Sequence, residues 1–144
     1  MDLNKDISSI SYNHLNLPEV VTVADKGMIT YTYNAAGNKI KKQTVETGAT
    51  VTYNGTPYPT DIITTTYYTG GFVYESKSYN DVGGILNPVL GYSDRLQLVG
   101  HEEGRIRALY DPSSPNTLTG FAYDYFIKDH LGNPLIAQAY ELMR

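Results

Sequence analysis

The sequence predicts an all-β fold of consecutive antiparallel β-hairpins, because its composition, its periodicity and its turn signals agree. The 144 residues include 14 Tyr, 13 Gly and 7 Pro but no Trp. Aromatic and β-branched residues suit a pleated, half-buried surface, whereas Gly and Pro favour turns. Apolar and polar residues alternate most clearly from Ile29 to Tyr33, and clusters of Gly, Asn and Pro interrupt such runs at short intervals. We therefore expect about ten strands and little helix.

The hairpin centred on residues 34–38 has the clearest pattern. Alternation places Ile29, Tyr31 and Tyr33 on one face of its first strand. The segment Asn-Ala-Ala-Gly-Asn then breaks the alternation, and its Asn and Gly tolerate the positive φ of a tight reversal. We expect a turn here, with positive φ at Gly37.

The return strand of this hairpin, residues 39–45, has Ile40 as its clearest inward residue. Its three lysines form the only tight basic group in the sequence. The whole chain has 11 Lys and Arg residues and 15 Asp and Glu residues, which give a net charge of −4. Nucleic-acid binding normally needs clustered basic residues on a positively charged surface. We interpret the lysines as solvated positions on a strand, and expect no nucleic-acid partner.

The remaining elements are predicted from the same signals. Residues 47–61, 80–91 and 111–116 are rich in Gly, Asn, Ser and Pro and are expected to be loops, the first with room for a short strand over 50–53. Residues 137–144 fit a short helix about as well as a strand. Strands are expected over 62–68, 72–75, 95–99, 105–110, 119–127 and 135–140, with turns at 69–71, 100–104 and 128–133.

No pattern in the sequence indicates catalysis or metal binding. The chain has no Cys, and His14, His101 and His130 lack the spacing of metal ligands. Asp124, Asp129 and His130 could be taken as an acid–base set, but Asp129 and His130 lie in a predicted tight turn, where Asp side chains bind backbone N–H groups. We expect turn residues in solvent, no enzyme activity, no cofactor and no metal.

A short motif occurs twice near the N-terminus. Tyr12 and Tyr33 are 21 residues apart, each is followed by Asn, and a residue that accepts positive φ comes three places after that Asn, namely Asn16 or Gly37. A single hairpin cannot bury its apolar face alone, so copies of such a unit must stack.

The second copy of this motif, within residues 31–40, resembles the YD repeat, a Tyr followed by Asp or Asn and then a Gly a few residues on. Residues 67–75 resemble a stretch that precedes the RHS core of Bacteroidetes proteins, and residues 104–106 with 123–133 resemble the start of the RHS repeat-associated core. The resemblance depends on Tyr31, Tyr33, Asn34, Gly37, Asn38, Gly70, Gly71, Tyr125, Asp129, His130, Leu131, Gly132 and Asn133.

The resemblance implies one region over residues 1–144, with YD-type repeats over 10–45 and the start of the core over 62–140. Two departures from the family accompany it. Pro134 and Leu135 stand where the family has an apolar residue and an Arg, and the chain ends at Arg144, before the segment in which the family cleaves itself. We therefore expect no hydrolytic or self-cleaving activity.

By this resemblance the chain is a non-catalytic section of a β-shell in a surface or secreted RHS-type polymorphic toxin. The implied partners are the remainder of the shell or another copy of the chain through strand edges, and further a toxin polypeptide or a glycan. An extracellular carbohydrate- or protein-binding module is the alternative function. Residues 1–11 contain no signal peptide and no apolar run spans a bilayer, so the surface or secreted location refers to a parent protein.

Overall fold

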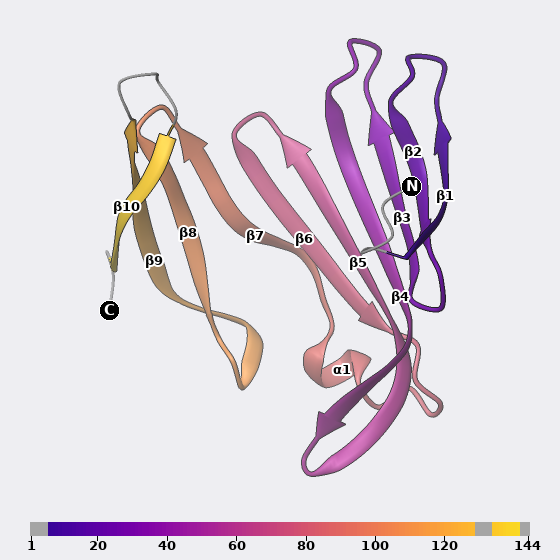
Figure 1. Ribbon diagram of the computed structural model, residues 1–144. Helices are drawn as coiled ribbons and strands as arrows, with labels where there is room; N and C mark the ends of the chain where they lie inside the picture. Colours follow the sequence, from indigo (N-terminus) through magenta and orange to yellow (C-terminus); the bar gives the residue numbers. More distant parts are fainter. Residues whose placement is uncertain (1–5, 129–133, 142–144) are drawn as a thin grey trace.

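A computed structural model describes residues 6–128 and 134–141, and these form one antiparallel sheet of ten strands in the order of the chain (Figure 1). The one helix within these ranges is α1 (Asn87–Leu90), in the connection between β6 and β7. The predicted all-β fold of consecutive hairpins is confirmed. The strands are β1 (Ile7–Tyr12), β2 (Pro18–Val23), β3 (Gly27–Tyr33), β4 (Lys39–Tyr53), β5 (Thr56–Thr69), β6 (Phe72–Tyr79), β7 (Tyr92–His101), β8 (Gly104–Asp111), β9 (Ser114–Lys128) and β10 (Pro134–Glu141).

The β4–β5 hairpin corrects the largest error of the sequence analysis. Residues 47–61, predicted as a loop, continue both strands, which reverse at Asn54 and Gly55 with φ of 50° and 78°. Pro57 and Pro59 pair with β4 inside this extension. They are tolerated because β6 pairs only with residues 62–69 of β5, so the extension has a free edge on which no backbone donor is needed.

Smaller differences concern strand boundaries. The residues of β2 are not among the predicted strands, and the predicted loop over 111–116 is shorter, because only Pro112 and Ser113 separate β8 from β9. Residues 137–141 belong to a strand, so over that stretch the helical alternative is wrong. Ile40 is 39% exposed and therefore does not point into a core.

The sheet forms a single layer with a very small core. Among residues 6–125, whose side chains the structure describes, Leu86 and Ala122 are the only buried apolar residues. Leu86 lies in the α1 loop, where the Asp81 carboxylate accepts the backbone N–H groups of Ile85 and Leu86 at 2.8 and 3.4 Å. The chain exposes 9584 Å², whereas a compact chain of 16.0 kDa exposes roughly 7400 Å². Most of the sheet surface is therefore open to solvent or to a partner.

None of the helices within the described ranges is long and apolar enough to cross a membrane.

Candidate functional site

The two copies of the Tyr-Asn motif fold into the same turn at the same end of the sheet. The side-chain Oδ1 of Asn13 accepts hydrogen bonds from the amides two and four residues later, at 2.9 and 3.1 Å. Asn34 does the same at 3.0 and 2.9 Å. In both turns the Asn amide donates to the carbonyl four residues later and the amide three residues later donates back. Asn16 and Gly37 both have the expected positive φ, 59° and 85°.

Tyrosine links one copy of the motif to the next. The Tyr33 hydroxyl donates to the Pro18 carbonyl at 2.7 Å, joining β3 to the start of β2. The Tyr31 and Tyr33 rings lie side by side with centroids 6.4 Å apart, as alternation along the strand requires. Lys39 lies over the Tyr31 ring at 4.3 Å. The predicted motif residues Tyr31, Tyr33, Asn34, Gly37 and Asn38 thus form one structural unit.

Gly70 and Gly71 form the turn between β5 and β6, as predicted. Gly70 has a φ of 59°. Gly71 allows the close approach of β7: its carbonyl accepts the Gly100 amide at 2.7 Å, and a Cβ at Gly71 would lie 2.9 Å from the Gly100 carbonyl oxygen.

The C-terminal motif is described only at its start. Tyr125 stacks on Tyr123 with centroids 5.1 Å apart and planes at 12°. Asp129, His130, Leu131, Gly132 and Asn133 lie outside the described residues, so the predicted positive φ at Gly132 stays a prediction.

Asp124 is the centre of a buried charge cluster. Its side chain is 3% exposed and accepts hydrogen bonds from Arg105 Nε at 2.8 Å and from Arg107 Nε and Nη2 at 2.6 and 3.2 Å. These bonds, from Arg107 first and then Arg105, hold the pKa of Asp124 below its ordinary value. A carboxylate kept ionised in this way is a poor proton carrier near neutral pH, so the geometry favours a structural role.

A second cluster, around Arg95, fills the gap where β7 leaves β8. The two strands pair only from Leu98 to His101 on the β7 side. Beyond that stretch the Arg95 guanidinium lies between the rings of Tyr92 and Tyr110, 3.7 and 4.2 Å from their centroids. Such stacking is favourable because the ring faces carry negative charge density.

Hydrogen bonds hold this Arg95 cluster to the backbone on both sides. Arg95 Nη1 donates to the Pro115 carbonyl at 2.5 Å, and the Tyr110 hydroxyl donates to the Leu96 carbonyl at 2.7 Å. The Tyr92 hydroxyl donates to the Glu75 carboxylate. Burial first, and then this bond, raise the pKa of Tyr92. Sequence reasoning missed the cluster because its members come from four separate strands and share no motif.

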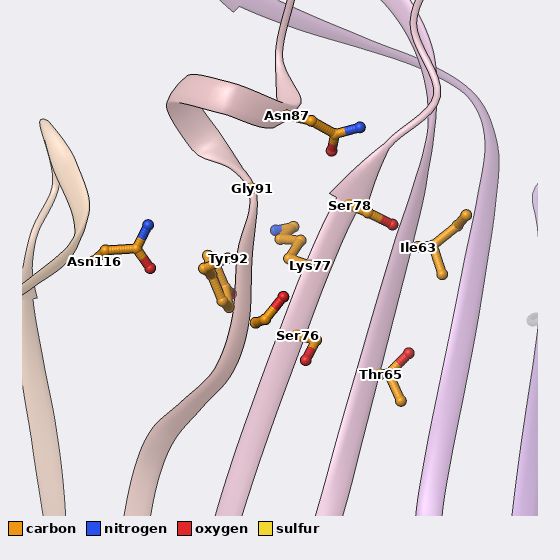
Figure 2. Close-up of a pocket in the computed structure, with 10 residues that line it drawn as sticks. Ile63, Thr65, Ser76, Lys77, Ser78, Asn87, Gly91, Tyr92 and Asn116 are labelled. Carbon is orange, nitrogen blue, oxygen red and sulfur yellow. The ribbon is translucent and has the colours of Figure 1, made fainter. Parts of the chain in front are cut away.

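Beside this cluster lies a hollow of about 570 Å³ with a mixed polar and apolar lining. Figure 2 shows Ser76 and Ser78 on β6 next to Ile63 and Thr65 on β5, with Tyr92 and Asn116 on the opposite side and Asn87 above. The hollow forms where the β6–β7 pairing loses its register, between Glu75 and Lys77. Hydroxyl, amide and aromatic groups gathered in this way suit a polyhydroxylated ligand better than an apolar one.

The two histidines that the structure describes lie in different surroundings. His14 is exposed in its turn, as predicted, and His130 lies outside the described residues. His101 corrects the prediction of a solvated turn residue: it ends β7 half-buried, packs edge-on against Tyr123 at 5.3 Å, and accepts the Glu103 amide at 3.2 Å. Among the side chains that the structure describes, those of residues 6–125, no three of His, Cys, Asp or Glu converge into a metal site.

Comparison with protein-family models, with curated proteins and with solved structures finds no match.

Proposed function

We propose that this chain is a non-catalytic structural segment of an RHS-type shell in a surface or secreted toxin-carrying protein. The observation that carries the proposal is the open, single-layer sheet. Over residues 6–125, the sheet has only Leu86 and Ala122 as buried apolar residues, so it gains little stability from a core of its own. Such a sheet is suited to be one section of a larger wall, in which neighbouring sections cover its edges and faces.

The repeated hairpin supports the same proposal. The turns at Asn13 and Asn34 use the same hydrogen bonds, and the Tyr33–Pro18 bond joins one unit to the next. A hairpin unit that contains the hydrogen bond to its neighbour can be repeated many times in one direction, as a repeat array requires.

The polar clusters also suit a structural role. Asp124 joins β8 to β9 and has both carboxylate oxygens occupied by arginine, while Arg95 bridges β7 to β9. Each cluster uses its charge to fix strands rather than to present a reactive group at a cleft.

Prolonged incubation followed by intact-mass measurement tests the non-catalytic part of the proposal. We expect the mass of the chain to stay constant. A discrete internal cut that disappears in Asp124→Asn, with the far-UV circular dichroism spectrum unchanged, would overturn the proposal.

The hollow in Figure 2 favours a second candidate function, carbohydrate binding. Its hydroxyl and amide groups can exchange hydrogen bonds with sugar hydroxyls, and Tyr92 offers part of a ring. A glycan array separates the two functions: a structural segment gives no specific signal. Binding that is lost in Asn116→Ala and retained in Asn54→Ala, a change at a distant turn, would establish the binding module instead.

A further inference from the structure

The sequence between β9 and β10 resembles that of the turn between β1 and β2, with the same His, Leu and Pro at matching positions. Residues 13–18 read Asn-His-Leu-Asn-Leu-Pro, and residues 129–134 read Asp-His-Leu-Gly-Asn-Pro. The strands on either side match in position as well. Tyr12 pairs with Pro18 at the end of β1, and Lys128 pairs with Pro134 at the end of β9. Pro134 therefore holds the place in β10 that Pro18 holds in β2.

The register of the two hairpins agrees again farther from the turn. The pairs in between differ by one position, because the register shift lies between Ser11 and Tyr12 in the first hairpin and between Ile136 and Gln138 in the last. Ser9 pairs with Thr22 in the first hairpin, and Tyr125 pairs with Gln138 in the last. Each of these residues in the last hairpin lies 116 positions after its counterpart in the first, the same spacing as Pro134 after Pro18. The β9–β10 hairpin is thus a third copy of the β1–β2 unit.

The neighbour of β2 within the chain shows which kind of strand fits against β10. That neighbour, β3, pairs with β2 and donates the Tyr33 hydroxyl to the Pro18 carbonyl. The outer edge of β10 pairs with no further strand among the described residues, and neither does the outer edge of β1. Unpaired sheet edges present rows of free N–H and C=O groups that pair readily with another strand.

β1 has the features that such a strand needs. It ends in Tyr12, the counterpart of Tyr33 by the 21-residue repeat. Tyr12 is 57% exposed, and its hydroxyl forms no hydrogen bond within the described part of the chain. Ten alternating strands also leave β1 and β10 running in opposite directions, so β1 of a second molecule can continue the antiparallel order beyond β10.

We infer that β10 of one copy pairs with β1 of a second copy, and that Tyr12 of the second donates to the Pro134 carbonyl of the first. The internal β2–β3 pair sets the register. Thr22 pairs with Met28 there. Gln138 is the counterpart of Thr22 and Ile7 lies 21 residues before Met28, so Gln138 faces Ile7 between copies.

This contact joins two different edges, so each added copy leaves one β1 edge and one β10 edge free. Contacts of this type build open rows, or rings where the curvature closes them, rather than isolated dimers. The inference goes beyond the proposed function, because it depends only on the repeat and not on what the sheet encloses.

A cysteine cross-link tests the register. The chain has no Cys, so Ile7→Cys and Gln138→Cys introduce one thiol each into separate preparations. Facing residues of antiparallel strands have Cα atoms about 4.5 to 5.5 Å apart, within the range of a disulfide. We expect the 7–138 disulfide to dominate when the two preparations are mixed and oxidised, as read by peptide mass spectrometry.

Glu141→Cys in place of Gln138→Cys is the matched control, since it moves the thiol about 10 Å along the strand. The cross-link yield should fall at least several-fold. Equal yields from positions 138 and 141, or a predominance of 7–7 and 138–138 products, would overturn the register. A chain that associates without the 7–138 product contradicts this interface and leaves the structural role standing.

Tyr12→Phe tests the hydroxyl contact separately. It removes a group that has no partner within the described residues, so the melting temperature of the isolated chain should not change. The association constant should fall about fivefold, the effect of one lost hydrogen bond. Tyr58→Phe, on the far extension of β5, should leave association unchanged. An unchanged association constant for Tyr12→Phe would contradict the proposed contact with Pro134.

Discussion

Asn13 and Asn34 close their turns with the same set of main-chain and side-chain hydrogen bonds, although the rest of the two turns has a different sequence. Because the two turns share these hydrogen bonds, the repeat is present in the folded structure as well as in the amino-acid sequence. Both turns combine an Asn with a residue of positive φ three places later, and the Tyr before the second Asn, Tyr33, connects its hairpin to β2.

The first prediction concerns the Asn side chain. Asn34→Ala removes both hydrogen bonds that Oδ1 accepts and leaves the backbone turn without its local support. We expect a loss of about 1–2 kcal/mol in the free energy of unfolding, measured by urea denaturation. Asn38→Ala is the matched control: its side chain is exposed, so the loss should stay within about 0.5 kcal/mol. Equal losses for both variants would show that Oδ1 does not hold the turn.

The second prediction concerns the backbone at Gly37. A Cβ there would meet Leu17 only at an ordinary 3.5 Å, so the penalty of a side chain comes from the φ of 85° and not from a clash. Gly37→Val should cost about 1–3 kcal/mol, because β-branched residues tolerate this conformation poorly. Gly37→Asn should cost clearly less, since Asn16 adopts the same region in the first turn. Thermal melts of both variants decide, and identical melts of Gly37→Val and wild type would refute the assignment.

The third prediction concerns the approach of β7 to Gly71. Gly71→Ala places a Cβ 2.9 Å from the Gly100 carbonyl oxygen, so β6 and β7 must move apart. We expect a loss of about 1–3 kcal/mol. Faster amide exchange at Gly100, which donates to the Gly71 carbonyl, should accompany this loss. A Cβ at Gly70 would meet no atom within 4 Å, and Asn tolerates its φ of 59°, so Gly70→Asn should have a smaller effect. Unchanged exchange at Gly100 in Gly71→Ala would contradict this account.

The fourth prediction concerns pH. Because the folded-state pKa of Asp124 lies below its ordinary value, its ion pairs add stability above the unfolded pKa, near 4. This contribution is lost as the pH falls through the folded pKa. Asp124→Asn should therefore lower the free energy of unfolding by about 1–3 kcal/mol at pH 7. In this variant the free energy of unfolding should also decrease less than in the wild type as the pH falls below about 4.

Asp25→Asn controls for the change of net charge in this experiment. Asp25 is exposed, and Asn accepts its φ of 59° without strain. This variant should follow the wild-type pH profile. If Asp124→Asn also follows the wild-type profile, the arginine cluster does not stabilise the fold.

Local patterns predicted the local structure well. Alternation from Ile29 to Tyr33 and the turn at Gly37 depend only on neighbours in sequence, and both are confirmed. The extension of β4 and β5 was missed because Pro57 and Pro59 are normally turn signals, and they act otherwise only on a free edge.

Non-local features could not be predicted from the sequence. The Arg95 cluster forms only because β7 separates from β8, and no sequence pattern around Arg95 predicts that separation. Ile40 is predicted to point inward because apolar residues usually face a core. The single-layer sheet has no core at that position, and Ile40 is exposed. The repeat unit is thus visible in local sequence, whereas the contacts that depend on the open arrangement of the sheet are not.

Sedimentation velocity over a range of concentrations tests the central claim, that this sheet is a section whose edges are completed by other strands. The account predicts that the weight-average sedimentation coefficient of the wild type rises with concentration. The double variant Ile136→Lys and Ala137→Lys places two charges on the β10 edge strand and should keep the chain monomeric. A wild type that stays a soluble monomer at every concentration, with no effect of the two lysines, would contradict the account.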